Sequence, residues 1–371
     1  MTGRSNKAAR RRILMSVDAV GGVWRYALDL AVGLKPLGLE TIFAVFGPRP
    51  SAEQVREAEA IGKLIYCDAP LDWMAETEAD LKAVPGTIAE LAARERADLV
   101  HLNLPSQAAA VDVGVPVVVV SHSCVSTWFH AVRGSSVPEA WQWQERLNRQ
   151  GFDQADAVLA PSRSHAALLG SVYGTIDGLQ VIRNASRVSP AGGPKDDFVF
   201  AAGRWWDDGK NGAVLDAAAP EISWPVVMAG SNRGPTGQYV PIEKARNRGE
   251  LSHAETMELM GKAAIVVSPS LYEPFGLAVL EAARCGSALV VADIPTYREL
   301  WDGAALFADP HDPRAFAAAV NRLVRDPSLR TICANRARIR SLDFTAEAQA
   351  NAVARLYTQI LSTKSAFTAA E

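Results

Sequence analysis

The chain has 371 residues and a formal net charge of −3 at neutral pH. This length is typical of two domains, and the weakly acidic balance argues against a nucleic-acid partner. Apolar residues make up 49% of the chain and predict sizeable cores. There is no run of about 18 apolar residues, no signal-peptide pattern and no framework spacing of the four cysteines. We therefore expect a cytoplasmic protein without a transmembrane helix.

The chain begins with a basic stretch, residues 1–12, that carries Lys7, Arg10, Arg11 and Arg12. We expect a flexible, solvated arm here. The alternative is peripheral contact with the inner face of an anionic membrane that carries a lipid-linked acceptor. No basic amphipathic helix is evident elsewhere, which favours the solvated arm.

Residues 13–183 alternate between short apolar, β-branched segments and helical stretches, such as 24–34 and 87–96. This alternation predicts a parallel sheet with helices on both faces. The expected strands are 13–17, 41–46, 64–66, 99–102, 117–120 and 158–160.

Two candidate binding elements of residues 13–183 lie at the ends of expected strands. Gly21 and Gly22 follow strand 13–17 and precede a helix, so their amides could approach a phosphate closely. An ordinary turn is the plainer interpretation. His122 follows strand 117–120, at the edge where open α/β sheets bind ligands. A lone histidine at a strand end is more often structural.

Residues 184–197 shift to Ser, Pro, Gly and charged residues, which is typical of an interdomain linker. The next segment, 198–343, repeats the α/β alternation and forms a second domain. Its expected strands are 198–202, 226–229, 265–267, 289–291 and 305–307. A break near 341–345 precedes a terminal segment, 344–371, that contains a last helix at 346–361. The predicted fold is two doubly wound parallel-sheet domains.

Two cations follow the first strand of the second domain. Arg204 comes directly after this strand, and Lys210 lies six residues later. A bidentate guanidinium and a compact ammonium would together suit a diphosphate. The alternative is that both are solvated loop charges paired with Asp207 or Asp208.

A strand, a tight loop and a helix follow one another around two carboxylates. Glu273 lies in the loop and Glu281 lies eight positions later, on the helix. The loop presents the amides of Phe275, Gly276 and Leu277 at the helix N-terminus, where an anion is favoured. Amides for phosphate and carboxylates for hydroxyls would suit a nucleotide sugar.

Other motifs are absent from the sequence. There is no G-x-G-x-x-G pattern, and the segment 203–211 has the wrong spacing and the wrong last residue for a Walker A loop. Neither an Asp-x-Asp pair nor a zinc-ligand spacing of His and Cys occurs. We therefore expect no metal site and no cofactor.

The carboxylate pair resembles the E-x7-E motif of the family 4 retaining glycosyltransferases with the GT-B fold. Further segments match this family in order and spacing, over residues 12–360. They are residues 21–23, 98–101, 117–122, 155–162, 203–210 and 292–299.

The resemblance implies two Rossmann-like domains that face each other across a cleft, the first for the acceptor and the second for a nucleotide-sugar donor such as a UDP- or GDP-sugar. It implies that the last helix packs back on the first domain. It also implies metal-independent transfer with retention, in which the leaving phosphate helps to deprotonate the acceptor.

Roles for single residues follow from the same resemblance. Arg204 and Lys210 would hold the diphosphate, together with the amides of Gly22 and of residues 275–277. Glu281 would accept hydrogen bonds from the ribose, and Glu273 and His122 would contact the donor sugar.

The acceptor, whether polysaccharide, lipid-linked saccharide or small glycoside, and the oligomeric state stay open. The alternatives are a catalytically idle nucleotide-sugar-binding or scaffold subunit and, less favoured, a GT-B sugar-nucleotide epimerase. Several aromatic residues could stack on an acceptor sugar, although packing is the favoured interpretation. They are Trp24, Trp128, Phe129, Trp141 and Trp143.

Overall fold

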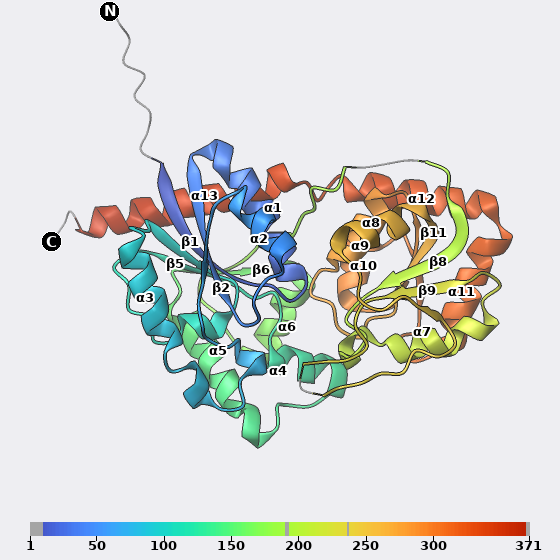
Figure 1. Cartoon of the computed structure of the whole chain (residues 1–371), viewed down its shortest axis with the longest axis horizontal. Helices are drawn as coiled ribbons and strands as arrows, with labels where there is room; N and C mark the ends of the chain where they lie inside the picture. Colours follow the sequence, from blue (N-terminus) through green and yellow to red (C-terminus); the bar gives the residue numbers. More distant parts are fainter. Residues whose placement is uncertain (1–9, 190–192, 236, 369–371) are drawn as a thin grey trace, which may run out of the picture.

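The computed structural model describes residues 10–189, 193–235 and 237–368, and it forms two α/β lobes side by side (Figure 1). In the first lobe, the described residues form a seven-stranded sheet of order β3-β2-β1-β4-β5-β6-β7. In the second, they form a six-stranded sheet of order β10-β9-β8-β11-β12-β13. Every pair of neighbouring strands in these two sheets is parallel. The two parallel-sheet domains expected from the sequence are therefore present.

The first lobe follows the expected alternation, with an additional edge strand. Its strands are β1 (Arg11–Asp18), β2 (Leu39–Phe46), β3 (Lys63–Tyr66), β4 (Leu99–Leu102), β5 (Val117–Val120), β6 (Ala157–Ala160) and β7 (Leu179–Val181). Its α-helices are α1 (Gly22–Leu34), α2 (Ala52–Glu59), α3 (Val84–Arg94), α4 (Val125–Trp128), α5 (Gln142–Gln154) and α6 (Arg163–Tyr173). Short helical turns are η1 (Lys35–Leu37), η2 (Asp72–Met74), η3 (Glu78–Leu81), η4 (Pro105–Ala108), η5 (Phe129–Arg133) and η6 (Glu139–Trp141).

The second lobe also has one strand more than the sequence predicts. Its strands are β8 (Asp196–Ala202), β9 (Val226–Ala229), β10 (Arg246–Asn247), β11 (Ala263–Ser268), β12 (Ala288–Ala292) and β13 (Leu306–Ala308). Its helices are α7 (Gly212–Ala218), α8 (His253–Lys262), α9 (Leu277–Arg284), α10 (Pro295–Trp301), α11 (Pro313–Arg325) and α12 (Pro327–Ser341), with turns η7 (Asp208–Lys210) and η8 (Ala219–Glu221). The unexpected strands β7 and β10 lie at sheet edges, where a short strand needs no apolar run.

The central strand β1 shows why the strands of these sheets carry apolar residues on both faces. Met15 and Val17 belong to one buried cluster, whereas Leu14, on the opposite face, belongs to another. A parallel strand covered by helices on both faces has no solvated side, so alternation of polar and apolar residues is lost.

The structure corrects the expected N-terminal arm. Arg11 and Arg12 belong to β1, where they pair with Leu39 and Glu40 of β2. The strand thus extends beyond its apolar part because its backbone continues to hydrogen-bond with its neighbour. Lys7 lies outside the described residues.

Two stretches of chain connect the lobes. Ser186 in the first crossing forms an isolated parallel bridge with Thr345 in the second. The last helix, α13 (Ala346–Thr368), then runs along the first lobe (Figure 1) and packs on α1, where Gly33 allows close approach to Ala350. The Tyr357 hydroxyl lies 2.6 Å from His101 Nδ1 beneath the first sheet. Among helices in the described residues, none has the length and apolar character that a bilayer crossing requires.

Direct hydrogen bonds also join the lobes. Ser162 Oγ donates to the carbonyl of Pro274 at 2.7 Å, and Thr127 Oγ1 lies 2.8 Å from the hydroxyl of Tyr272. Glu299 of α10 accepts the backbone N–H of Ser164 at 2.7 Å, so a carboxylate of the second lobe caps helix α6 of the first. The lobes are thereby fixed to each other near the floor of the space between them.

Candidate functional site

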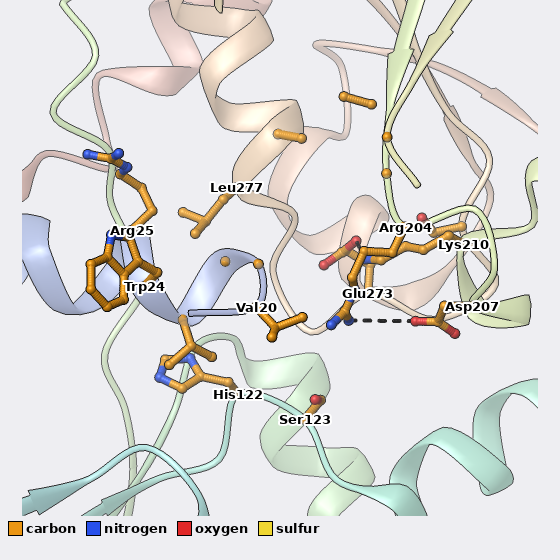
Figure 2. A pocket seen from close by; sticks show the side chains of 18 of the residues that line it. Val20, Trp24, Arg25, His122, Ser123, Arg204, Asp207, Lys210, Glu273 and Leu277 are labelled. Carbon is orange, nitrogen blue, oxygen red and sulfur yellow. Dashed lines mark hydrogen bonds and ion pairs between the residues drawn. The ribbon is translucent and has the colours of Figure 1, made fainter. Parts of the chain in front are cut away.

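A cavity of about 1460 Å³ opens between the lobes, and both contribute to its walls (Figure 2). All the site residues expected from the sequence line this one cavity, although they come from segments far apart in the chain. They are Gly22, His122, Arg204, Lys210, Glu273, Phe275, Gly276, Leu277 and Glu281.

The two cations of the second lobe reach the cavity from the loop after β8. Lys210 Nζ lies 2.5 Å from Glu273 Oε2, and both side chains are largely buried. The Arg204 guanidinium faces the cavity and lies 3.7 Å from the carboxylate of Asp207 (Figure 2). Each cation therefore has a carboxylate neighbour, and the expected alternative of an Arg204–Asp207 pair is present alongside the orientation into the cavity.

The loop before α9 requires a glycine. Gly276 adopts φ +87°, and a Cβ at this position would stand 2.9 Å from the ring of Tyr297. Gly276 precedes the first residue of α9, Leu277, and its carbonyl accepts the first backbone bonds of the helix. No side chain caps this end, and no acidic residue stands in its first turn. The positive end of the helix dipole is thus presented to the cavity.

The N-terminus of α1 meets this end of α9. Gly21, at φ +97°, precedes α1, which also lacks a side-chain cap and an acidic first turn. A Cβ on Gly22 would lie 3.5 Å from Leu277, and one on Gly21 would lie 3.7 Å from Arg204 Nη1. Two uncapped helix N-termini and a guanidinium therefore converge across the lobes, an arrangement suited to an anion with more than one negative charge.

Glu281 lies deeper in the cavity, on the second turn of α9. It is 7% exposed. Burial, with a smaller contribution from nearby Asp29 and against the opposing effect of Arg25 of α1, raises its pKa to about 7. Near neutral pH this carboxyl can both accept and donate hydrogen bonds, which suits a pair of vicinal hydroxyls.

His122 is held as a neutral imidazole at the end of β5. Burial lowers its pKa to about 3, with smaller contributions from His101 and His165. Asn103 donates its amide N–H to the carbonyl of Ser16 at 2.6 Å, which turns Asn103 Oδ1 toward His122 Nε2, 2.9 Å away. Nε2 therefore carries the proton, and Nδ1 is left as an acceptor for a hydroxyl.

Asp18, the last residue of β1, was not predicted as a site residue from the sequence. It lines the cavity with 4% exposure, and its Oδ1 accepts the N–H of Val20 at 2.8 Å. Burial raises its pKa to about 6, against the opposing effects of that hydrogen bond and of Arg204. Its position at a strand end beside Gly21 is the signal that could have identified it.

The aromatic residues divide into two groups. Trp143 packs on a core, as favoured from the sequence, and Trp24 is buried in a core while its edge also borders the cavity. Trp128, Phe129 and Trp141 are less buried and line the cavity in an edge-to-face row, with ring centroids 5.2 and 5.6 Å apart.

Trp128 also contacts the loop after β8, which carries Arg204 and Lys210, and sequence reasoning missed this contact. Its Nε1 donates to Asp207 Oδ1 at 2.9 Å. Gly209 permits this approach, since a Cβ there would stand 2.8 Å from the indole nitrogen. Next to it, Arg133 forms an ion pair with Asp208. The first lobe thus positions the loop that carries Arg204 and Lys210.

No metal ligand set accompanies these groups: the described part of the chain brings together no cluster of three or more His, Cys, Asp or Glu side chains that could hold an ion.

Two family models match the chain. Residues 20–186 match the model described as Glycosyltransferase Family 4, and residues 235–340 match the model described as Glycosyl transferases group 1. Glycogen synthase of Mycobacterium tuberculosis is 27% identical over 71% of this chain and 69% of its own length. D-inositol 3-phosphate glycosyltransferase of Kineococcus radiotolerans is 26% identical over 98% of each chain.

Solved structures of the same architecture span almost the whole chain. Sucrose-phosphate synthase from Thermosynechococcus elongatus superposes with a TM-score of 0.77 at 18% identity, over 95% of this chain and 100% of its own. Anabaena HepE in complex with UDP and glucose superposes with a TM-score of 0.76 at 16% identity, over 94% and 100%. These likenesses confirm the fold class expected from the sequence, with two Rossmann-like domains that face each other across a cleft.

Proposed function

The chain belongs to the family 4 glycosyltransferases, which have the GT-B fold, and on this premise we propose that it transfers a sugar from a nucleotide-sugar donor to a hydroxyl of a carbohydrate or lipid-linked acceptor. The solved complexes of HepE contain UDP or UDP-glucose and support a nucleotide-sugar donor here. The named relatives include two enzymes that act in glycoside synthesis, glycogen synthase and D-inositol 3-phosphate glycosyltransferase.

The observation that carries the proposal is the convergence of two uncapped helix N-termini, those of α1 and α9, on Arg204. A nucleoside diphosphate is a compact dianion or trianion, and this arrangement supplies backbone N–H groups and a guanidinium to it. Lys210 adds a second cation from the same loop. The charge that develops on the leaving diphosphate would then be stabilised by groups that are already in place.

Further groups fit the remainder of the donor. Glu281 lies one helical turn deeper than the amides of α9, at a distance along the helix that suits the ribose. Glu273, next to Lys210, and the Nδ1 acceptor of His122 are positioned for sugar hydroxyls. The donor would therefore lie along α9, with its sugar toward the first lobe.

In the proposed reaction the bond between the anomeric carbon and the phosphate oxygen breaks, and the acceptor oxygen bonds to the same face of that carbon. The acceptor proton passes to the leaving phosphate oxygen, so that charge and protons balance. This route retains the anomeric configuration. It needs no metal, because Arg204, Lys210 and the helix N-termini neutralise the diphosphate.

A panel of UDP-, GDP-, ADP- and dTDP-sugars in thermal unfolding tests the proposal. The matching donor at a hundredfold excess over its dissociation constant should stabilise the protein by about 2.7 kcal/mol. With that donor, slow release of the nucleoside diphosphate should occur without acceptor, at rates in EDTA within twofold of those in magnesium. Stabilisation without release would favour an idle binding subunit, and neither effect with any donor would reject the proposal. Loss of release in EDTA, restored by magnesium, would reject metal independence.

A further inference from the structure

The cavity has two chemically different walls. We call the second lobe's wall, with its two cations and the N-terminus of α9, the donor wall, and the first lobe forms the opposing wall. It presents two buried carboxylates, Asp18 and Asp72, together with the indole of Trp73. Asp72 Oδ1 accepts the N–H of Trp73 at 2.7 Å, and its Oδ2 accepts Ser106 Oγ at 2.6 Å. These bonds fix the Asp72 carboxylate in place and fix the backbone of Trp73 beside it.

Asp18 has one carboxylate oxygen that is available as a hydrogen-bond acceptor. Its Oδ1 is occupied by the Val20 N–H, and no hydrogen bond to its Oδ2 occurs among the residues that the structure describes. Arg204 and Asp72 both act on its charge, one from the loop after β8 and one from the first lobe. Asp18 therefore has an unoccupied acceptor oxygen in the first lobe's wall of the cavity, which also holds Asp72 and Trp73.

Cations are already matched with carboxylates around this cavity. Among the described residues that line it, the cationic side chains are Arg25, Arg133, Arg204 and Lys210. Arg25 forms a two-point pair with Glu57, at 2.6 and 3.2 Å, and Arg133 pairs with Asp208. Arg204 and Lys210 are required by the donor diphosphate. A second phosphate group on the acceptor would thus enter a space with two buried carboxylates and no cation left to receive it.

The same lobe also lines the cavity with aromatic rings. The row of Trp128, Phe129 and Trp141 borders the cavity, and Trp141 is 44% exposed. Rings at a polar cleft stack on the C–H faces of sugar rings, while carboxylates accept their hydroxyls. Both features recognise an uncharged carbohydrate.

We propose that the acceptor is an uncharged saccharide, whose hydroxyls are bound by Asp18 and whose ring stacks on the aromatic row, and that Asp18 selects against phosphorylated acceptors. This inference rests on the proposed function and narrows it. It separates this chain from a transferase for a phosphorylated acceptor, the activity for which its relative D-inositol 3-phosphate glycosyltransferase is named.

The test uses the full chain with the donor that stabilises it. Nucleoside diphosphate release is measured above the rate without acceptor, for mono- and disaccharides and for the same sugars carrying a phosphate, with myo-inositol and an inositol phosphate as a further pair. Neutral members should accelerate release with kcat/KM at least tenfold above their phosphorylated counterparts. Equal or greater acceleration by the phosphorylated members, or none by any neutral member, would overturn the proposal.

Asp18→Asn provides the residue-level test, because the amide oxygen can still accept the Val20 N–H. For the neutral acceptor, kcat/KM should fall at least tenfold, mainly through a higher KM, while the dissociation constant for the nucleoside diphosphate rises no more than twofold. Asp112→Asn, at an exposed carboxylate outside the cavity, is the matched control. An unchanged acceptor KM in Asp18→Asn would show that Asp18 does not bind the acceptor.

The two levels of proposal fail differently. If no donor stabilises the protein or is hydrolysed, the proposed function itself is wrong, and the acceptor assignment falls with it. If the donor binds and is hydrolysed but phosphorylated acceptors are preferred, only the acceptor assignment is wrong. If Asp18→Asn does not fold, the acceptor panel on the unmodified protein still decides.

Discussion

The second lobe assembles its wall of the cleft from two loops and one helix N-terminus, whereas the first lobe assembles its wall from the ends of separate strands. Arg204 and Lys210 share one loop, and Glu273 and Glu281 share the loop and helix that follow β11. In the first lobe, Asp18 ends β1 and His122 follows β5, more than a hundred residues away in the chain. The wall of the second lobe is thus formed by groups that lie close in sequence. The wall of the first lobe is formed by groups that only the sheet brings together.

The two walls also differ in charge. The second lobe's wall offers the N-terminus of α9 and two cations, with the carboxylates of Glu273 and Glu281 beside them. Apart from the N-terminus of α1, the first lobe's wall offers buried carboxylates and an imidazole that stays neutral. The first set suits a charged leaving group and the second suits neutral hydroxyls. Under the proposed function, this contrast would help one cleft to distinguish donor from acceptor, because each wall would repel or leave unpaired the groups that the other is expected to bind.

The largest expected effect is on the donor wall, in the Arg204→Ala/Lys210→Ala double variant. Charged hydrogen bonds contribute roughly 1.5–3 kcal/mol each, so affinity for the nucleoside diphosphate should fall by roughly a hundredfold to ten-thousandfold. Isothermal titration calorimetry measures this loss directly. Lys262→Ala, which removes the lysine of an exposed surface pair with Glu258, is the control. Undiminished affinity in the double variant would show that the diphosphate lies elsewhere.

A smaller effect, on stability, is expected for Glu281→Gln. Burial raises the folded-state pKa of Glu281 from 4.5 to about 7, so the folded protein holds the proton more tightly than the unfolded chain does. This contribution to stability is fully present below pH 4.5 and is lost as the pH rises through 7. At pH 8 the ionised carboxylate therefore costs about 3 kcal/mol, which the uncharged amide avoids.

The variant should accordingly unfold at higher denaturant concentration than the parent at pH 8 and at a nearly equal one at pH 4.5. Glu90→Gln, at an exposed position of α3, should show no such pH-dependent difference. A gain for Glu281→Gln that is the same at both pH values would mean that the carboxylate is not destabilised by burial in the folded state.

The sequence predicted the strand, loop and helix that carry Glu273 and Glu281 almost completely, for a physical reason. A strand followed by Gly and Pro and then a helix fixes its own geometry, so the amides near Gly276 and the carboxylates around them could be placed from local rules alone. The continuous apolar runs of β1 and β11 likewise predicted buried parallel strands, because side chains on both faces are covered.

The wall formed by the first lobe could not be predicted to the same degree. Asp18 ends its strand in a turn that looks ordinary in sequence, and only burial beside Arg204 makes it exceptional. The hydrogen bond from Trp128 to Asp207 joins residues of different lobes, and no local pattern announces it. Edge strands such as β10 were missed since two exposed polar residues carry no periodic signal. Contacts that depend on the relative position of the two lobes cannot be predicted from short-range sequence patterns.

The smallest effect that distinguishes the walls is expected for His122→Ala. Nε2–H is committed to Asn103, and Nδ1 is the acceptor available to a sugar hydroxyl. Loss of one such hydrogen bond, worth about 1 kcal/mol, should lower sugar transfer by roughly five- to tenfold. Affinity for the nucleoside diphosphate should change less than twofold, because we expect the phosphates to bind to the other lobe and to the N-terminus of α1.

The pH dependence of this loss sharpens the argument. Since burial keeps the pKa of His122 at about 3, the imidazole stays neutral between pH 5 and 9, and the ratio of variant to parent transfer rates should be constant over that range. His311→Ala, at an exposed histidine outside the cavity, is the control. A ratio that changes with a midpoint near 6.5 would show a titrating imidazole. An equal loss of nucleotide affinity would show instead that His122 belongs to the donor wall, and the division between the two walls would then be wrong.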